Sequence, residues 1–114
     1  SIFKRKKLLI NREPEKNQFD FASFKFDSKL RTLQYQKENP IKLSPKENEL
    51  LKMLLSYSND LMPRELALVK IWNDDNYFTS RSMDVYVTKI RKYLKLDPKI
   101  SIENIHGKGF KMNV

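Results

Sequence analysis

Hydrophobic and polar residues alternate in the first part of the chain, and this pattern predicts short β-strands. Phenylalanine takes the alternating positions, with a change of parity at residues 22–23: Phe19, Phe21, Phe24 and Phe26. A change of parity within a period of two requires a turn or a bulge, so two strands are expected. A third strand is predicted from two alternating pairs and a fourth from one pair: Leu30 with Thr32, Leu33 with Tyr35, then Ile41 with Leu43. Four such strands with short connections favour an antiparallel meander whose aromatic face is buried.

The run Ser44-Pro45-Lys46-Glu47 predicts the start of a helix. Ser at the N-cap, Pro at the first helical position and Glu at the third form a capping box, which satisfies two backbone N–H groups reciprocally. Asn59-Asp60 marks the end of this helix, and four leucines share one of its faces: Leu50, Leu51, Leu54 and Leu55.

Two further helices are predicted after this one. Pro63 opens the second, which runs to about Trp72 and turns three apolar residues inward: Leu66, Leu68 and Val69. After a polar loop at residues 73–76, Thr79 or Ser80 caps the third helix, which ends near Leu94. Apolar residues four, three and four positions apart form one stripe that docks the third helix on the core: Met83, Val87, Ile90 and Leu94.

The C-terminal stretch returns to a strand pattern. Ile100 and Ile102 alternate with polar residues, and so do three residues at the end of the chain: Phe110, Met112 and Val114. Gly107 and Gly109, the two glycines of the sequence, lie between these runs. Glycine at one tight turn predicts a hairpin whose backbone needs a positive φ. The expected fold is therefore α+β, with a four-stranded antiparallel sheet, three helices and a C-terminal hairpin.

The net charge of +9 is concentrated at the two ends of the chain. Residues 19–79 carry nine basic and nine acidic residues, whereas residues 80–114 carry eight basic and three acidic ones. Residues 1–18 carry six basic and two acidic residues and include Pro14, so a linker is expected there. The 114 residues make one domain, and the first residue, Ser rather than Met, indicates a piece of a longer protein. A strong positive field favours a polyanionic partner.

Several classes of site are excluded by composition. The chain has no cysteine, which excludes disulfides, thiolate catalysis and Cys-based zinc sites, and its single histidine excludes a multi-histidine metal cluster. Asp74 and Asp75 are adjacent acids with no histidine partner, which indicates solvated side chains or a partner contact. We therefore expect no enzyme activity, no metal and no cofactor. No apolar run approaches the ~20 residues of a membrane span, and no signal peptide is recognisable.

The face of the third helix opposite its apolar stripe is basic. It presents Arg81, Val85, Thr88 and Lys92, flanked by Lys89 and Lys95. Lys and Arg neutralise phosphates, a Thr hydroxyl reads a donor or an acceptor, and a Val side chain meets a thymine methyl group. Asp84, expected in the first turn of the helix, serves the helix dipole. The hairpin that follows carries basic side chains suited to an adjacent groove: His106, Lys108 and Lys111.

These features favour binding of double-stranded DNA over two alternatives. One alternative is a protein-interaction module whose basic surface binds an acidic partner, and the other is a protein that binds structured RNA. The aromatic residues weigh against single-stranded RNA, because no basic strand carries paired aromatics for base stacking. Trp72 is interpreted as a core or boundary residue whose indole N–H can reach a DNA phosphate.

Three stretches of sequence resemble one known family, the OmpR/PhoB-type winged-helix effector domains of bacterial response regulators. They are Pro63-Arg64-Glu65 with Trp72 nine positions after the proline, the run from Ser80-Arg81-Ser82-Met83-Asp84-Val85 to Lys92-Tyr93-Leu94, and Ile105-His106-Gly107-Lys108-Gly109-Phe110. The resemblance covers residues 19–114. It implies a winged helix-turn-helix domain at 19–114, preceded at 1–18 by the tail of a receiver domain and a linker.

The resemblance also implies roles for individual residues. Arg81 matches a position that contacts phosphate, four residues match positions that read or adjoin bases (Val85, Tyr86, Thr88 and Lys89), and Arg91 and Lys92 match backbone contacts. The hairpin is the wing, with Asn104, His106 and Lys108 as candidate contacts in the minor groove. The loop before the third helix corresponds to a contact with RNA polymerase: Asn73, Asp74, Asp75, Asn76 and Tyr77.

The resemblance implies that the protein acts in a two-component phosphorelay in the cytoplasm, and this in turn implies its partners. They are double-stranded DNA with tandem half-sites, RNA polymerase, the receiver domain of the full-length chain, a sensor histidine kinase acting on that receiver, and a second copy on DNA. No membrane is involved.

Three positions depart from the family pattern: Pro63 replaces a hydroxyl cap, Tyr86 and Thr88 replace His and Arg, and His106 replaces a wing arginine. Fewer guanidinium groups imply a site more tolerant of A·T pairs.

Overall fold

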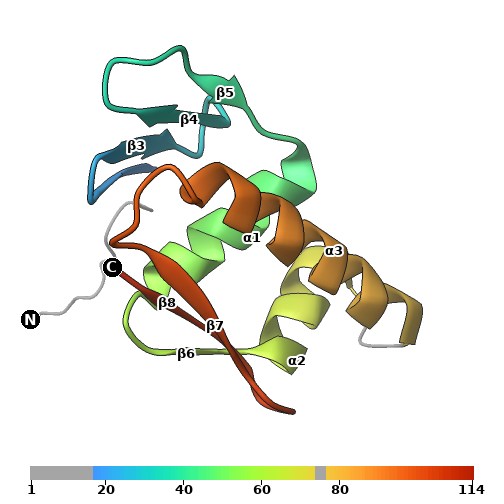
Figure 1. The fold of residues 1–114 in the computed structure, drawn as a ribbon. Coiled ribbons are helices and arrows are strands. Elements are labelled where there is room, and N and C mark those ends of the chain that lie inside the picture. Colours follow the sequence, from blue (N-terminus) through green and yellow to red (C-terminus); the bar gives the residue numbers. More distant parts are fainter. Residues whose placement is uncertain (1–16, 74–76) are drawn as a thin grey trace, which may run out of the picture.

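The computed structural model describes residues 17–73 and 77–114 (Figure 1). The first sheet has the order β2-β3-β4-β5, and its strands are β2 Gln18–Phe21, β3 Phe24–Asp27, β4 Thr32–Tyr35 and β5 Ile41–Lys42. The helical elements are α1 Pro45–Ser56, α2 Arg64–Ala67 with its π-helical continuation η1 Leu68–Trp72, and α3 Tyr77–Leu94. The second sheet has the order β6-β8-β7, with β6 Leu61–Pro63, β7 Ser101–Ile105 and β8 Gly109–Asn113.

The antiparallel meander predicted from the phenylalanine pattern is confirmed. Ala22 adopts φ 51° in the turn between β2 and β3, which is where the parity of the alternation changes. Phe21 stacks on Phe24 with ring centroids 5.4 Å apart, and Phe24 and Phe26 are almost fully buried. The aromatic face of this sheet therefore belongs to the core, as the alternation indicates.

The assignment of Leu30 to the third strand is wrong. Its side chain is 59% exposed, and β4 begins only at Thr32. The carboxylate of Asp27 accepts hydrogen bonds from the backbone N–H groups of Lys29 and Leu30, at 3.0 and 3.1 Å. This local capping by an aspartate, followed by Arg31 at φ 57°, stabilises a turn in place of an extended strand.

The capping box of α1 is confirmed in both directions. The Ser44 N–H donates to Glu47 Oε1 at 2.8 Å, and the Glu47 N–H donates to Ser44 Oγ at 3.3 Å. All four leucines of the predicted face are buried: Leu50, Leu51, Leu54 and Leu55. The chain leaves α1 through Asn59, whose N–H donates to the Met112 carbonyl at 2.7 Å and so connects the end of α1 to β8.

The second helix differs from the prediction in its inward face. Its core residues are Ala67, Leu68 and Ile71, whereas Val69 is 52% exposed and Leu66 is half-buried. The reason is the change from α2 to the π-helical η1 at Leu68, because a wider turn alters which positions face the core. Pro63 is the N-cap residue and provides no side-chain hydrogen bond, so the departure at this position weakens the helix start.

The third helix begins earlier than predicted. It starts at Tyr77, so Thr79 and Ser80 lie inside its first turns and neither is the N-cap. For the same reason Asp84 is in the second turn, away from the amides at which a carboxylate interacts best with the helix dipole. The predicted apolar stripe is confirmed, since all four of its side chains are at most 3% exposed: Met83, Val87, Ile90 and Leu94.

The C-terminal hairpin is part of a larger sheet than predicted, because β6 adds a third strand. Met62 of β6 is fully buried and lies opposite Phe110 of β8. Three residues that include Pro63 carry too little alternation to indicate a strand. The predicted positive φ is present at Gly107, at 72°. Val114 lies beyond β8 and is 45% exposed, so it does not continue the buried alternation.

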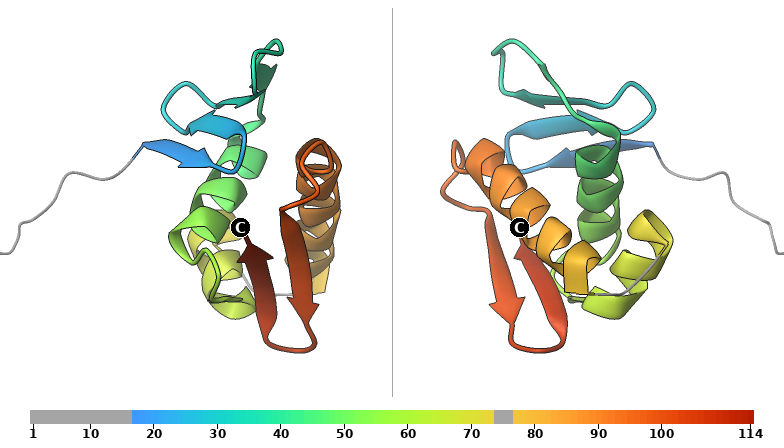
Figure 2. Two further views of the ribbon diagram at one scale, coloured as in Figure 1. Left: turned by 60° about the vertical axis from the view of Figure 1, so that its left-hand side comes forward. Right: turned by 90° about the vertical axis from the view of Figure 1, so that its right-hand side faces the viewer.

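The elements are arranged so that α3 and the hairpin share one side of the molecule (Figures 1 and 2). α1 crosses behind α3, and the first sheet covers the end of the molecule at which α3 finishes. Ser23 N–H donates to the buried Asp97 carboxylate at 3.2 Å, which ties the first sheet to the loop after α3. No helix among the described residues is long and apolar enough to cross a membrane.

Candidate nucleic-acid interface

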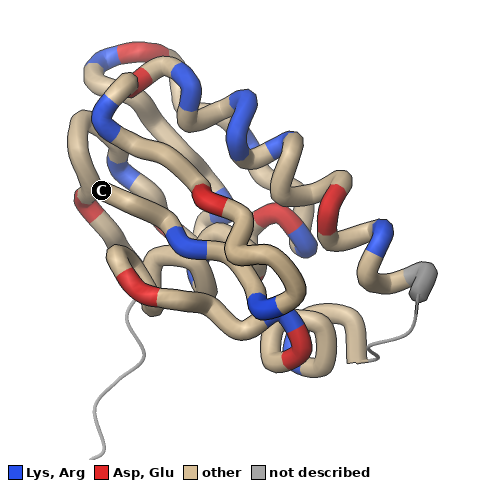
Figure 3. The backbone as a smooth tube through the Cα atoms, turned by 60° about the horizontal axis from the view of Figure 1, so that its bottom comes forward, with Lys and Arg blue, Asp and Glu red and all other residues tan. Residues whose placement is uncertain are grey.

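The outward face of α3 includes the residues that the sequence placed there, with Asp84 and Arg91 in addition, and the predicted flanking Lys95 is exposed just beyond the end of the helix. Figure 3 shows Lys and Arg recurring along α3 and in the hairpin. The exposed members of this face are Arg81, Asp84, Val85, Thr88, Lys89, Arg91 and Lys92. Asp84 is the single acidic residue of α3, so the face carries a net positive charge.

Two uncharged side chains lie among these charges. Val85 is 55% exposed, so its methyl groups are accessible from outside. The Thr88 hydroxyl donates to the Asp84 carbonyl at 3.0 Å, one helical turn earlier. With its proton used in this bond, Thr88 Oγ1 presents lone pairs outward and can accept a hydrogen bond from a ligand.

Tyr86 lies at the edge of this face and not at its centre. Its half-buried ring packs against Trp72, with the centroids 5.8 Å apart, and Lys89 Nζ lies 5.0 Å from the Tyr86 centroid. On the other side, Lys46 Nζ lies 5.5 Å from the Trp72 ring and donates to the Ile71 carbonyl at 2.6 Å. Trp72 is therefore a boundary residue, as predicted, held between α1 and α3.

Arg91 joins α3 to the hairpin. Its Nη2 and Nε donate to the Ile102 carbonyl of β7 at 2.7 and 3.3 Å. The remaining surface of the Arg91 side chain is exposed. The hydrogen bonds fix the position of this guanidinium group and hold β7 alongside α3.

The hairpin carries three exposed side chains near its tip: Asn104 in β7, and His106 and Lys108 in the turn. Lys108 N–H donates to the Ile105 carbonyl at 2.9 Å and closes the turn around Gly107. A Cβ atom at Gly109 would lie 2.0 Å from the Met62 carbonyl oxygen, so only glycine allows β8 to approach β6 this closely. The glycines therefore determine where Lys108 and His106 emerge.

Arg64 organises the interface, and the sequence prediction missed its role. Its Nη2 donates to Ser80 Oγ at 2.6 Å, to the Ser80 carbonyl at 3.0 Å and to Asp84 Oδ1 at 2.8 Å. Its guanidinium carbon lies 5.6 Å from the Phe110 ring centroid, and its N–H donates to the Lys108 carbonyl at 2.9 Å. One residue thus connects α2, α3 and the hairpin. An arginine at the first position of a helix, where cations are disfavoured, is the signal that could have indicated a tertiary partner.

The C-terminal end of α3 is fixed to the start of α1 by a hydrogen bond from the Tyr93 hydroxyl to Glu47 Oε2 at 2.8 Å. Burial alone raises the pKa of the Glu47 carboxyl, but the hydrogen bonds donated by Ser44 and Tyr93 outweigh it and hold the pKa below the ordinary 4.5. Burial, reinforced by the bond to Glu47, raises the pKa of Tyr93 above its ordinary 10.0.

The predicted polymerase-contact loop is described only in part. Asn73 ends η1 in a left-handed conformation at φ 60° and is exposed. Asp74, Asp75 and Asn76 lie outside the described residues, and of Tyr77 the structure describes the helical backbone. Within residues 17–73 and 77–114, no three His, Asp or Glu side chains gather as they would around a metal ion.

Comparisons with known sequences point to transcription regulators. The family described as "Transcriptional regulatory protein, C terminal" matches residues 37–112. The transcriptional regulatory protein RprY of Bacteroides fragilis is 48% identical over 98 residues, which cover 86% of this chain and 41% of RprY. YxdJ of Bacillus subtilis is 33% identical over 81 residues, which cover 70% of this chain and 35% of YxdJ. The chain thus spans less than half the length of these relatives.

Solved structures agree with this result. The DNA-binding domain of Bacillus subtilis CssR matches with a TM-score of 0.66 and 29% identity, covering 79% of this chain and 99% of that one. The response regulator DrrB, an OmpR/PhoB homologue from Thermotoga maritima, matches with a TM-score of 0.72 and 28% identity. The match covers 88% of this chain and 46% of the DrrB chain. The predicted winged-helix fold is therefore confirmed.

Proposed function

Because the chain belongs to the family of transcriptional regulatory proteins that share this C-terminal domain, we propose that it binds double-stranded DNA at specific sequences and so regulates transcription. The observation that carries this proposal is the geometry of one surface. The basic face of α3 is exposed along its length, and the hairpin lies beside it on the same side of the molecule. An α-helix fits the major groove of B-form DNA, and a hairpin beside it can reach the adjacent minor groove.

The charged residues of the surface are assigned to the phosphate backbone. Lys89, Lys92 and Arg81 extend from the exposed face of α3, and Lys108 extends from the hairpin. Contacts of this kind position a protein on DNA and provide most of its affinity, but they do not read sequence. Trp72 can contribute its indole N–H at the edge of the surface.

The two uncharged residues of α3 are assigned to base recognition. Val85 can contact a thymine methyl group, since more than half of its side chain is exposed. Thr88 donates to the Asp84 carbonyl, so we assign to its hydroxyl the acceptor role, towards an amino group of adenine or cytosine. This assignment is narrower than the sequence allowed, because a free hydroxyl could donate or accept.

The proposed partners follow from the resemblance to response regulators. A receiver domain precedes the chain in the full-length protein, and a sensor histidine kinase phosphorylates it. Two copies occupy tandem half-sites on DNA, and the loop at residues 73–77 contacts RNA polymerase. Since the ligand is chromosomal DNA, the proposed location is the cytoplasm.

Selection of bound duplexes from a random pool tests the proposal. We expect one enriched sequence, repeated at a spacing of about 10–11 bp when two copies bind in tandem. On the selected site, Thr88→Ala or Val85→Ala is expected to cost about 1–3 kcal/mol at particular base pairs and nothing at the others. Lys92→Ala is expected to weaken binding to all duplexes alike. A pool that shows no enrichment would reject the proposal, as would duplex RNA that competes as well as DNA.

A further inference from the structure

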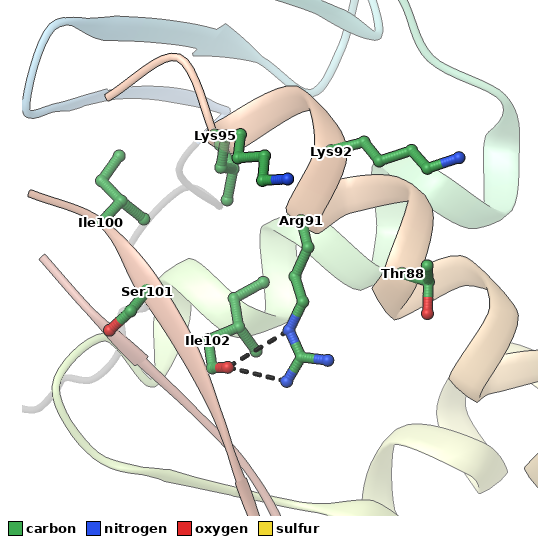
Figure 4. A pocket seen from close by; sticks show the side chains of 8 residues that line it. Thr88, Arg91, Lys92, Lys95, Ile100, Ser101 and Ile102 are labelled. Carbon is green, nitrogen blue, oxygen red and sulfur yellow. Dashed lines mark hydrogen bonds between the residues drawn. The ribbon is translucent and has the colours of Figure 1, made fainter. Parts of the chain in front are cut away.

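A groove of about 460 Å³ separates the C-terminal half of α3 from the start of β7 (Figure 4). Its lining comes from these two elements and from the chain that connects them: Thr88, Arg91, Lys92, Leu94, Lys95, Ile100, Ser101 and Ile102. Sites for small molecules in proteins usually measure ~300–1,000 Å³, so the groove has room for a compact ligand.

The floor of the groove is apolar. It is formed by Leu94, Ile100 and Ile102, which are 3%, 8% and 8% exposed. These side chains are part of the core, so the floor is fixed by packing on its inner side. The methylene stem of Lys95 extends the apolar wall outward.

The rim of the groove is positively charged. Arg91, Lys92 and Lys95 stand along it, and none of the side chains that line it is acidic. Figure 4 shows Arg91 reaching across to the Ile102 carbonyl, which holds this cation at one edge. Neither Lys92 nor Lys95 forms an ion pair with a described residue. Figure 4 shows the Lys92 side chain extending away from β7, so the Lys95 ammonium group is the one available to a ligand on the apolar floor.

We propose that this groove binds a small amphipathic anion, namely a carboxylate with an apolar tail. The apolar tail lies on Leu94, Ile100 and Ile102, and the carboxylate faces the Lys95 ammonium group at the rim. An apolar floor with a few convergent polar groups is the usual composition of a ligand site. A purely ionic ligand would leave the floor exposed, and a neutral one would leave the cations unpaired.

The location of the groove gives this ligand a regulatory effect, which rests on the DNA-binding function proposed above. Thr88 and Lys92 belong both to the groove and to the surface assigned to DNA. An anion bound there occupies the space of the DNA and neutralises cations that would otherwise meet phosphates. Binding of the anion and binding of duplex DNA are therefore mutually exclusive.

Binding is tested first without DNA, by titrating the chain with octanoate and following methyl resonances by NMR at constant ionic strength. We expect saturable shifts at the methyl groups of Leu94, Ile100 and Ile102, with none at Ile41 in the first sheet. Acetate, which lacks the tail, and 1-octanol, which lacks the charge, are expected to bind at least ten-fold more weakly. The proposal would be overturned if the shifts did not saturate, if they were scattered over the surface, or if 1-octanol bound as tightly as octanoate.

Variants that remove one positive charge test whether the rim of the groove binds the carboxylate. Lys95→Gln is expected to weaken octanoate binding about two- to five-fold, the effect of one exposed ion pair. Lys99→Gln makes the same change in net charge at an exposed residue outside the groove and is the matched control. Equal effects of the two variants would indicate general attraction to a basic surface and would reject the site.

The competition is tested by the anisotropy of a labelled duplex carrying the selected sequence. Octanoate at ten times its own dissociation constant is expected to weaken duplex binding about ten-fold. The same octanoate concentration is expected to weaken duplex binding by the Lys95→Gln variant less, because this variant binds octanoate more weakly. Octanoate that binds the groove without weakening the duplex would overturn the competition alone. A chain that binds octanoate but no duplex would reject the proposed function and leave the ligand site standing, whereas DNA binding without octanoate binding would show that the groove serves only the DNA backbone.

Discussion

The two glycines of the hairpin turn are required for different physical reasons. Gly107 has a φ of 72° and open space around the position of a Cβ, whereas a Cβ at Gly109 would lie 2.0 Å from the Met62 carbonyl oxygen. Gly107→Ala is therefore expected to cost about 1 kcal/mol of backbone strain. Gly109→Ala must push two strands apart and is expected to cost about 3 kcal/mol. Urea unfolding followed by circular dichroism measures both, and equal losses would show that the approach of β6 to β8 is not constrained by Gly109.

Glu47 makes stability depend on pH in the acidic range. Its pKa is lowered in the folded chain below the ordinary 4.5, so the unfolded chain binds the proton more readily. The stabilisation is complete above pH 4.5 and is lost as the pH falls from there through the folded pKa. Glu47→Gln and Tyr93→Phe are each expected to reduce the slope of unfolding free energy against pH below 4.5. Slopes identical to that of the unmodified chain would exclude this carboxyl as a cause of acid unfolding.

At the scale of the elements, Arg64 holds three parts of the interface together. Arg64→Ala removes hydrogen bonds to Ser80, the ion pair with Asp84 and the contact with the Phe110 ring, so we expect a loss of about 1–3 kcal/mol in unfolding free energy. Asp84→Asn removes only the ion pair, in which the Asp84 side chain is 55% exposed, and is expected to cost less than about 1 kcal/mol. Denaturant unfolding of both variants checks this, and the reverse ranking would contradict the role given to Arg64.

The elements that the sequence predicted correctly are those that carry a local signal. The phenylalanine alternation predicted β2 and β3, the capping box predicted the start of α1, and the apolar stripe predicted the buried side of α3. The missed features depend on tertiary contacts. β6 is a strand only because β8 pairs with it, and the register of the second helix changes at a π-helical segment that its composition does not reveal.

At the scale of the whole molecule, the sequence predicted which residues face outward but not how they are held. The periodicity of α3 placed Val85, Thr88 and Lys92 on one exposed face, and the structure agrees. The bonds of Arg64 to Ser80 and of Arg91 to Ile102 join segments that are 16 and 11 residues apart in the chain. No spacing rule covers such pairs, so the relative position of helix and hairpin, and the groove between them, could be found only from the structure.

The salt dependence of duplex binding tests most directly whether this surface binds DNA. The logarithm of the association constant is expected to fall linearly with the logarithm of the salt concentration, by about 0.9 for each phosphate neutralised. Lys92→Gln is expected to reduce that slope by about 0.9 on every duplex. Lys37→Gln makes the same change of charge at an exposed position in the turn between β4 and β5 and is expected to leave the slope unchanged. Equal slopes for Lys92→Gln and Lys37→Gln would contradict the account, because DNA would then lie elsewhere on the molecule.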